Sequence, residues 1–187
     1  MSDFTLRAKT EIPDQKLPAA KGKAKMKTTI YLPIAAILLT ASLAVSAAQH
    51  QVPFKGSLQG QEIDTPQGGP PPSTLSVDGS ATGIATHVGE FSFTYQVTVN
   101  LANGMGTGSA RLTAANGDSV YTTIAGASTP TSTPGVLDIT EINTITGGTG
   151  RFVGAQGSFT VERLVNQVTG FTSGSFHGTI TSPGAAH

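Results

Sequence analysis

The segment "LDITEINTI", residues 137–145, places a carboxylate and an amide among apolar residues, where they could take part in acid–base chemistry. Side chains of an extended chain alternate between two faces, so Glu141 and Asn143 lie on the same face. That face also carries Leu137, Ile139 and Ile145. If it points into a dry interior, Glu141 could donate or accept a proton. The opposite assignment, with the even-numbered residues inward and Glu141 in water, fits the same segment.

His87, in "GIATHVGEF", is a further catalytic candidate, as a general base or a ligand. His87 directly precedes the clearest strand-like segment. The alternative to a catalytic role is therefore a histidine that lies beside a turn and hydrogen-bonds the backbone through its ring. The four histidines show no metal-ligand spacing. We therefore expect no metal and no other cofactor.

Arg163 alternates with apolar residues in "SFTVERLV", residues 158–165. Its face also carries Phe159, Val161 and Val165. A guanidinium on an inward face needs a carboxylate partner, because an unpaired buried charge is costly. We expect Glu141 to be that partner, in a pair that is structural or that contributes to ligand binding.

The clearest strand is "EFSFTYQVTVNL", residues 90–101. Apolar residues occupy every second position and polar residues the others, which is typical of a sheet with one dry face. The apolar face begins with Phe91, Phe93 and Tyr95, and we expect these aromatic residues to contact a ligand.

Short β-type segments separated by turns make up the rest of the chain. Glycine is frequent, charged residues are only 12% and no long helical pattern is present, so an all-β domain is expected. We predict an eight-stranded antiparallel up-and-down β-barrel in residues 49–187. Residues 64–74 predict an irregular Pro/Gly loop, and residues 75–89 a bent or bulged strand. The other expected strands are 51–63, 107–115, 118–128, 136–146, 155–168 and 171–181.

The segment "GGTGRFVGAQG", residues 147–157, has the glycine density of a phosphate-binding loop. Such a loop needs a helix after it, whose N-terminus faces the anion. Residues 158–165 alternate like a strand, and no Gly-Lys-Ser/Thr follows, so these glycines serve the fold. We expect positive φ at Gly147 and Gly148, a bulge at Gly154 and Gly157, and Phe152 plugging one barrel end.

The same segment resembles the Gly-Gly-Thr-Gly-x-Phe-x-x-Ala-x-Gly segment of plant dirigent proteins and, more loosely, of allene oxide cyclases. The chain as a whole resembles bacterial exported proteins with an allene oxide cyclase-like barrel. The resemblance implies an eight-stranded antiparallel barrel and, because these families are commonly trimers, a homotrimer. It transfers no site residues: the cyclase site includes a cysteine, and this chain has none.

An export signal is expected at residues 26–48. Lys25 and Lys27 flank Met26, an apolar stretch covers residues 30–45 and small residues follow, the order of a secretory signal peptide. We expect a secreted or periplasmic protein without membrane attachment after cleavage. The alternative is a membrane anchor, but the apolar run is shorter than the ~20 residues of a spanning helix. Residues 1–25 are expected to be disordered or a misassigned start.

Charge argues against nucleic acid as a partner. Four basic residues stand against eight acidic ones after residue 27, so the body of the protein is mildly acidic.

Three functions fit these observations. The first is an exported barrel that binds a small apolar or aromatic molecule. The second is an isomerase, similar to allene oxide cyclases or dirigent proteins, that acts on a reactive lipophilic intermediate with Glu141, Asn143 and His87. The third is a structural surface protein that acts through assembly.

The export hypothesis predicts a mature N-terminus at Ala48 or Gln49, because the small residues before them suit signal peptidase. N-terminal sequencing of the exported protein tests this. A product that begins "MSDFTL" would contradict it.

Overall fold

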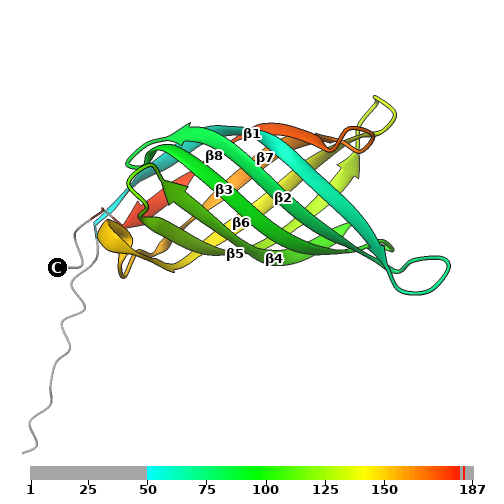
Figure 1. Cartoon of the computed structure of the whole chain (residues 1–187), viewed down its shortest axis with the longest axis horizontal. Coiled ribbons are helices and arrows are strands. Elements are labelled where there is room, and N and C mark those ends of the chain that lie inside the picture. Colours follow the sequence, from blue (N-terminus) through cyan, green and yellow to red (C-terminus); the bar gives the residue numbers. More distant parts are fainter. Residues whose placement is uncertain (1–49, 182, 184–187) are drawn as a thin grey trace, which may run out of the picture. The chain divides into compact units, whose positions relative to one another are not determined.

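The computed structural model describes residues 50–181 and residue 183, so the predicted segments 1–25 and 26–48 lie outside the described residues. Eight strands follow one another around a closed barrel, each antiparallel to its neighbours, and the last pairs with the first (Figure 1). The predicted all-β, up-and-down barrel is therefore confirmed. The elements are β1 (Gln51–Gln67), β2 (Thr74–Ala85), β3 (Gly89–Asn100), β4 (Met105–Ala114), β5 (Ser119–Pro130), β6 (Val136–Gly148), η1 (Gly150–Phe152), β7 (Gly157–Asn166) and β8 (Phe171–Thr181).

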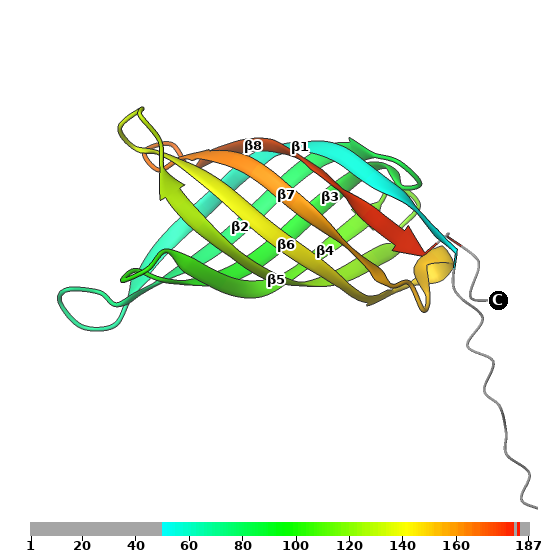
Figure 2. The ribbon, with the colours of Figure 1, turned by 180° about the vertical axis from the view of Figure 1, so that it is seen from behind.

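Alternation of apolar and polar residues decides which side of each strand faces the lumen. In β3, Phe91, Phe93 and Tyr95 are each 4% exposed, whereas Ser92 and Thr94 between them are exposed. The strands run obliquely around the barrel, as the view from behind also shows (Figure 2). Within residues 50–181 and residue 183, no helix is long and apolar enough to cross a membrane.

β1 is longer than the sequence predicted. Residues 64–67, expected to be irregular, continue the strand and pair with residues 74–77 of β2. β1 pairs with β8 as far as Gln61, and after the hydrogen bond of Glu62 described next, that side of β1 is a free edge. The backbone N–H of Glu62 points to the β8 side, where it bonds Gly170. Pro66 has the same parity, so its missing N–H falls on the free edge and removes no ladder bond.

The glycines of β2 do not produce the predicted bulge. The register of β2 with β1 and with β3 is continuous from Thr74 to Ala85. Gly79 and Gly83 instead lie opposite Tyr95 and Phe91 of β3. A Cβ on Gly83 would lie 2.7 Å from Cζ of Phe91, and a Cβ on Gly79 would overlap the Tyr95 ring. These glycines therefore make room in the lumen for aromatic rings.

The glycine-rich segment between β6 and β7 bends the chain as expected, but at other residues. Thr146 is the extra residue of a bulge, because Ile145 pairs with Thr122 while Gly147 pairs with Tyr121. The predicted bulge at Gly154 and Gly157 is thus wrong in position. Gly147, with φ 144°, adopts the expected positive φ, whereas Gly148 does not. The single turn η1 follows, and then strand β7.

The short helical turn η1 lies at one end of the barrel, which we call the closed end (Figure 1). Aromatic side chains of the core pack in the lumen toward this end. Phe152 is 1% exposed, in line with its expected role as a plug. In the same core cluster, neighbouring rings of four further phenylalanines have centroids 5.0 to 6.0 Å apart. These are Phe54, Phe91, Phe159 and Phe176.

Arg151 ties the turns of the closed end together. Its Nη2 donates to the carbonyl oxygen of Val88 in the β2–β3 turn at 3.3 Å, and its Nε lies 3.8 Å from a carboxylate oxygen of Asp118 in the β4–β5 turn. Its guanidinium also covers the Phe152 ring at 4.9 Å. The lone arginine of the glycine-rich segment therefore has a structural role.

Replacing Gly79 with Ala should lower the free energy of unfolding by about 1–3 kcal/mol, because the new methyl group overlaps the buried Tyr95 ring. Urea unfolding measures the change. Gly69→Ala is the matched control, since nothing lies within 4 Å of its Cβ position. Equal stability of the two variants would contradict the packing account.

Candidate functional site

Buried polar side chains form a network in the lumen, between the phenylalanines and the opposite end of the barrel. We call it the ion cluster. Its charged members are only 6–9% exposed, although charged residues are rarely buried unless they are paired. The members are Glu62, Tyr95, Glu141, Arg163 and Thr172.

Arg163 is the centre of the ion cluster. It holds Glu141 with two parallel hydrogen bonds, from Nε to Oε2 at 3.2 Å and from Nη2 to Oε1 at 3.1 Å. Its Nη1 donates to Glu62 Oε2 at 2.7 Å and to the Thr172 hydroxyl at 3.1 Å. Burial lowers the pKa of Arg163, but the two carboxylates outweigh it and raise the pKa above its ordinary value. Arg163 therefore stays charged.

Tyr95 completes the cluster from the β3 side. Its hydroxyl donates to Glu62 Oε2 at 2.8 Å, and the Arg163 guanidinium carbon lies 5.0 Å from its ring centroid. Burial raises the pKa of Tyr95, Arg163 acts against it, and the Glu62 and Glu141 carboxylates add to the rise, so that the pKa stays above its ordinary value. The phenol thus remains a hydrogen-bond donor at neutral pH.

Glycines on neighbouring strands make space for these long side chains. Gly174 of β8 lies opposite Arg163, and a Cβ there would be 2.6 Å from the Arg163 Cβ. Gly126 of β5 lies opposite Glu141, and a Cβ there would be 2.7 Å from the Glu141 Cγ. The register of the barrel therefore places a residue without a side chain beside each partner of the bidentate pair.

A pocket of about 160 Å³ opens above the ion cluster at the end of the barrel that carries the β1–β2 and β5–β6 loops. We call it the mouth pocket. Glu62, Glu141 and Arg163 line it together with Asp64. Burial and the Glu62 carboxylate raise the pKa of Asp64, and Arg163 acts against them. The aliphatic lining includes Leu75, Val77, Val97, Val99, Leu137 and Ile139.

The structure brings Glu141 and Arg163 together as the sequence predicted, and both point into the lumen. Asn143 is also buried and accepts a hydrogen bond from Thr122 at 2.9 Å. Its Nδ2 has no hydrogen-bond partner among the described residues, and it does not line the mouth pocket. Both oxygens of Glu141 are engaged by Arg163, which leaves this carboxylate poorly placed to exchange protons with a substrate.

His87 lies apart from these groups. It is exposed in the β2–β3 turn at the closed end, with a φ of 62°. Across residues 50–181 and residue 183, no three His, Asp or Glu side chains are grouped so that they could hold a metal ion.

The aromatic residues expected to bind a ligand occupy two different places. Phe91 and Phe93 belong to the packed core and do not line the mouth pocket, whereas Tyr95 belongs to the ion cluster. From this face of β3, Val97 and Val99 line the mouth pocket in place of the predicted Phe91 and Phe93.

Sequence reasoning missed Glu62 and Thr172. Glu62 has the parity of Phe54 and Leu58, which are both buried, so the alternation of β1 could have identified it. Thr172 has the parity of Phe176 and Ile180, which are both buried, but threonine is also frequent on the outer face, for example at Thr94, so its type gave no hint of a site.

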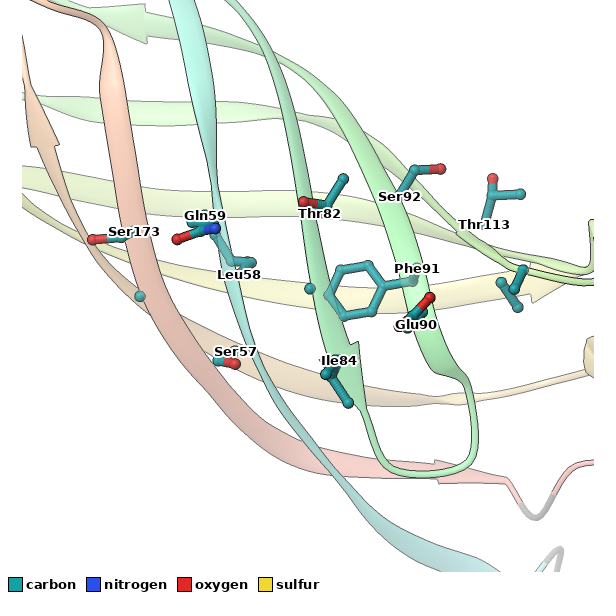
Figure 3. Close-up of a pocket in the computed structure, with 14 residues that line it drawn as sticks. Ser57, Leu58, Gln59, Thr82, Ile84, Glu90, Phe91, Ser92, Thr113 and Ser173 are labelled. Carbon is teal, nitrogen blue, oxygen red and sulfur yellow. The ribbon is translucent and has the colours of Figure 1, made fainter.

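A broad hollow of about 980 Å³ also lies on the outer wall (Figure 3). Short polar side chains such as Ser57, Thr82 and Ser92 line it. Its charged residue, Glu90, is exposed and forms no ion pair within the described part of the chain. The mouth pocket, which combines an enclosed aliphatic wall with buried charge, is the better candidate site.

No known protein family, curated protein or solved structure matched this chain. The resemblance to allene oxide cyclase and dirigent barrels is accordingly supported at the level of the eight-stranded architecture.

Arg163→Met should lower the free energy of unfolding by about 3–5 kcal/mol, because it leaves Glu62 and Glu141 buried without their cation. Urea unfolding of the wild type and the variant tests this. Arg111→Met, on the exposed face of β4, makes the same substitution but removes only one hydrogen bond, to Ser119 Oγ, and a contact with the Tyr121 ring, so it should cost about 1 kcal/mol. Similar losses in both variants would show that the ion cluster does not hold the lumen together.

Proposed function

We propose that the protein binds a small apolar or aromatic molecule in the mouth pocket. The proposal rests on one observation. Aliphatic side chains form the wall of a partly enclosed space of about 160 Å³, and the charged groups of Glu62, Glu141 and Arg163 form its floor. Ligand sites in proteins commonly combine a mostly apolar lining with a few fixed polar groups.

Size sets the scale of the ligand. An apolar cavity of ~150 Å³ accommodates a benzene-sized molecule. The phenylalanines fill the lumen toward the closed end, so a ligand enters only as far as the ion cluster. The ligand proposed is thus a compact molecule, or the end of a larger one that protrudes from the mouth.

Binding is favoured over isomerase chemistry by the state of Glu141. A general acid or base needs an oxygen within reach of the substrate, and Arg163 occupies both oxygens of this carboxylate.

We retain export to a secreted or periplasmic location, and assembly as a homotrimer, as parts of the proposal that rest on the sequence.

Toluene should bind saturably and shift the NMR signals of the Val97 and Val99 methyl groups, because both residues line the mouth pocket. Val99→Trp fills the pocket and should abolish the effect. The matched control is Thr98→Trp, which adds the same ring to the exposed outer face and should leave binding intact. No saturable shift in the wild type, or equal binding by Val99→Trp, would overturn the proposal.

A further inference from the structure

We propose that the mouth pocket selects a small apolar amine in its positively charged form over neutral and anionic molecules of the same size. This inference rests on the proposed function, because it assigns the charge of the ligand that the pocket would take.

The first argument is the balance of charge around the pocket. Three carboxylates, of Glu62, Asp64 and Glu141, line it against a single guanidinium, that of Arg163. No other Lys or Arg of the described chain lines it. When all four groups are ionised, two negative charges remain uncompensated in a partly enclosed space, where charges are screened less than in bulk water. A cation entering this space is attracted, and an anion is repelled.

The second argument is that Arg163 has only one N–H donor left to bind an anion. A guanidinium has five N–H donors, and Arg163 uses four of them on Glu141, Glu62 and Thr172. One N–H on Nη2 remains, so Arg163 cannot present the two-pronged fork with which arginine usually binds a carboxylate or phosphate.

The third argument is a free acceptor on Glu62. Its Oε2 accepts from both Tyr95 and Arg163, whereas Oε1 accepts from no group within the described residues. The side chain is only 6% exposed and lines the pocket. Asp64 stands beside it, and its raised pKa reflects partial burial and the proximity of this carboxylate. An ammonium donor would satisfy Oε1 at the floor.

The aliphatic wall supplies the other half of the recognition. Val97, Val99 and Leu137 surround the space above the carboxylates. An ammonium group at the floor would therefore leave the apolar body of the ligand against these side chains, where its burial adds to the affinity.

The test compares three probes built on one ring: toluene, benzylamine and benzoate. At low salt and neutral pH, benzylamine should bind the purified protein about tenfold more tightly than toluene, because it adds a charge-assisted hydrogen bond. Benzoate should bind more weakly than toluene. Added salt should reduce the advantage of benzylamine and leave toluene binding unchanged.

Two variants locate the effect. Glu62→Gln keeps the shape of the side chain and should bring benzylamine down to the affinity of toluene. Asp64 is only partly covered by the protein, so Asp64→Asn does not threaten folding, and it should weaken benzylamine binding about threefold. Asp138→Asn is the matched control, because Asp138 is exposed on β6 and does not line the pocket. It should leave all three affinities unchanged.

The outcomes separate this inference from the proposed function. Toluene binding with no advantage for benzylamine, or tighter binding of benzoate, would overturn the amine inference alone. Saturable binding of neither toluene nor benzylamine would overturn both. Benzylamine binding without toluene binding, sensitive to Asp64→Asn, would support the amine inference and contradict a purely apolar ligand.

Discussion

The interaction on which the lumen depends is the sharing of one buried guanidinium between two carboxylates. Arg163 of β7 joins Glu141 of β6 to Glu62 of β1, and so links strands across the barrel interior. Each charge is tolerable in the lumen only because the others are present. The ion cluster divides the interior into two parts, a packed aromatic half toward η1 and an aliphatic pocket toward the mouth.

A second constraint is the narrowness of an eight-stranded barrel, which leaves just enough interior for side chains. Large inward residues are therefore accommodated by glycine on the adjacent strand. Gly56 lies opposite Phe176, with 2.8 Å between its Cβ position and the ring, and Gly178 lies opposite Phe159. The glycines of residues 147–157, whose density suggested a phosphate loop, serve the bulge and the turn between β6 and β7 instead. The candidates for a functional role are therefore the few polar residues that face the lumen, and not the glycines.

The sequence predicted the barrel because alternation is a local property that each strand displays by itself. The strand β3 is the clearest example, with Phe91, Phe93 and Tyr95 on one face. The sequence did not decide whether Glu141 faces the lumen, because β6 also carries an apolar residue on its outer face, Ile142, which is 55% exposed. The mouth pocket could not be predicted, because its walls come from strands far apart in the chain and their meeting depends on the register around the closed barrel.

The central claim, a guanidinium fixed between two carboxylates in the lumen, is tested most directly by NMR of the arginine side chains. The Nη hydrogens of Arg163 should give separate signals that exchange slowly with water, because four of its five N–H groups are hydrogen-bonded in a buried site. Arg111 is exposed and its side chain donates through Nε, to Ser119 Oγ, so its Nη groups provide the reference for averaged, rapidly exchanging signals. Arg163 signals that behave like those of Arg111 would contradict the account.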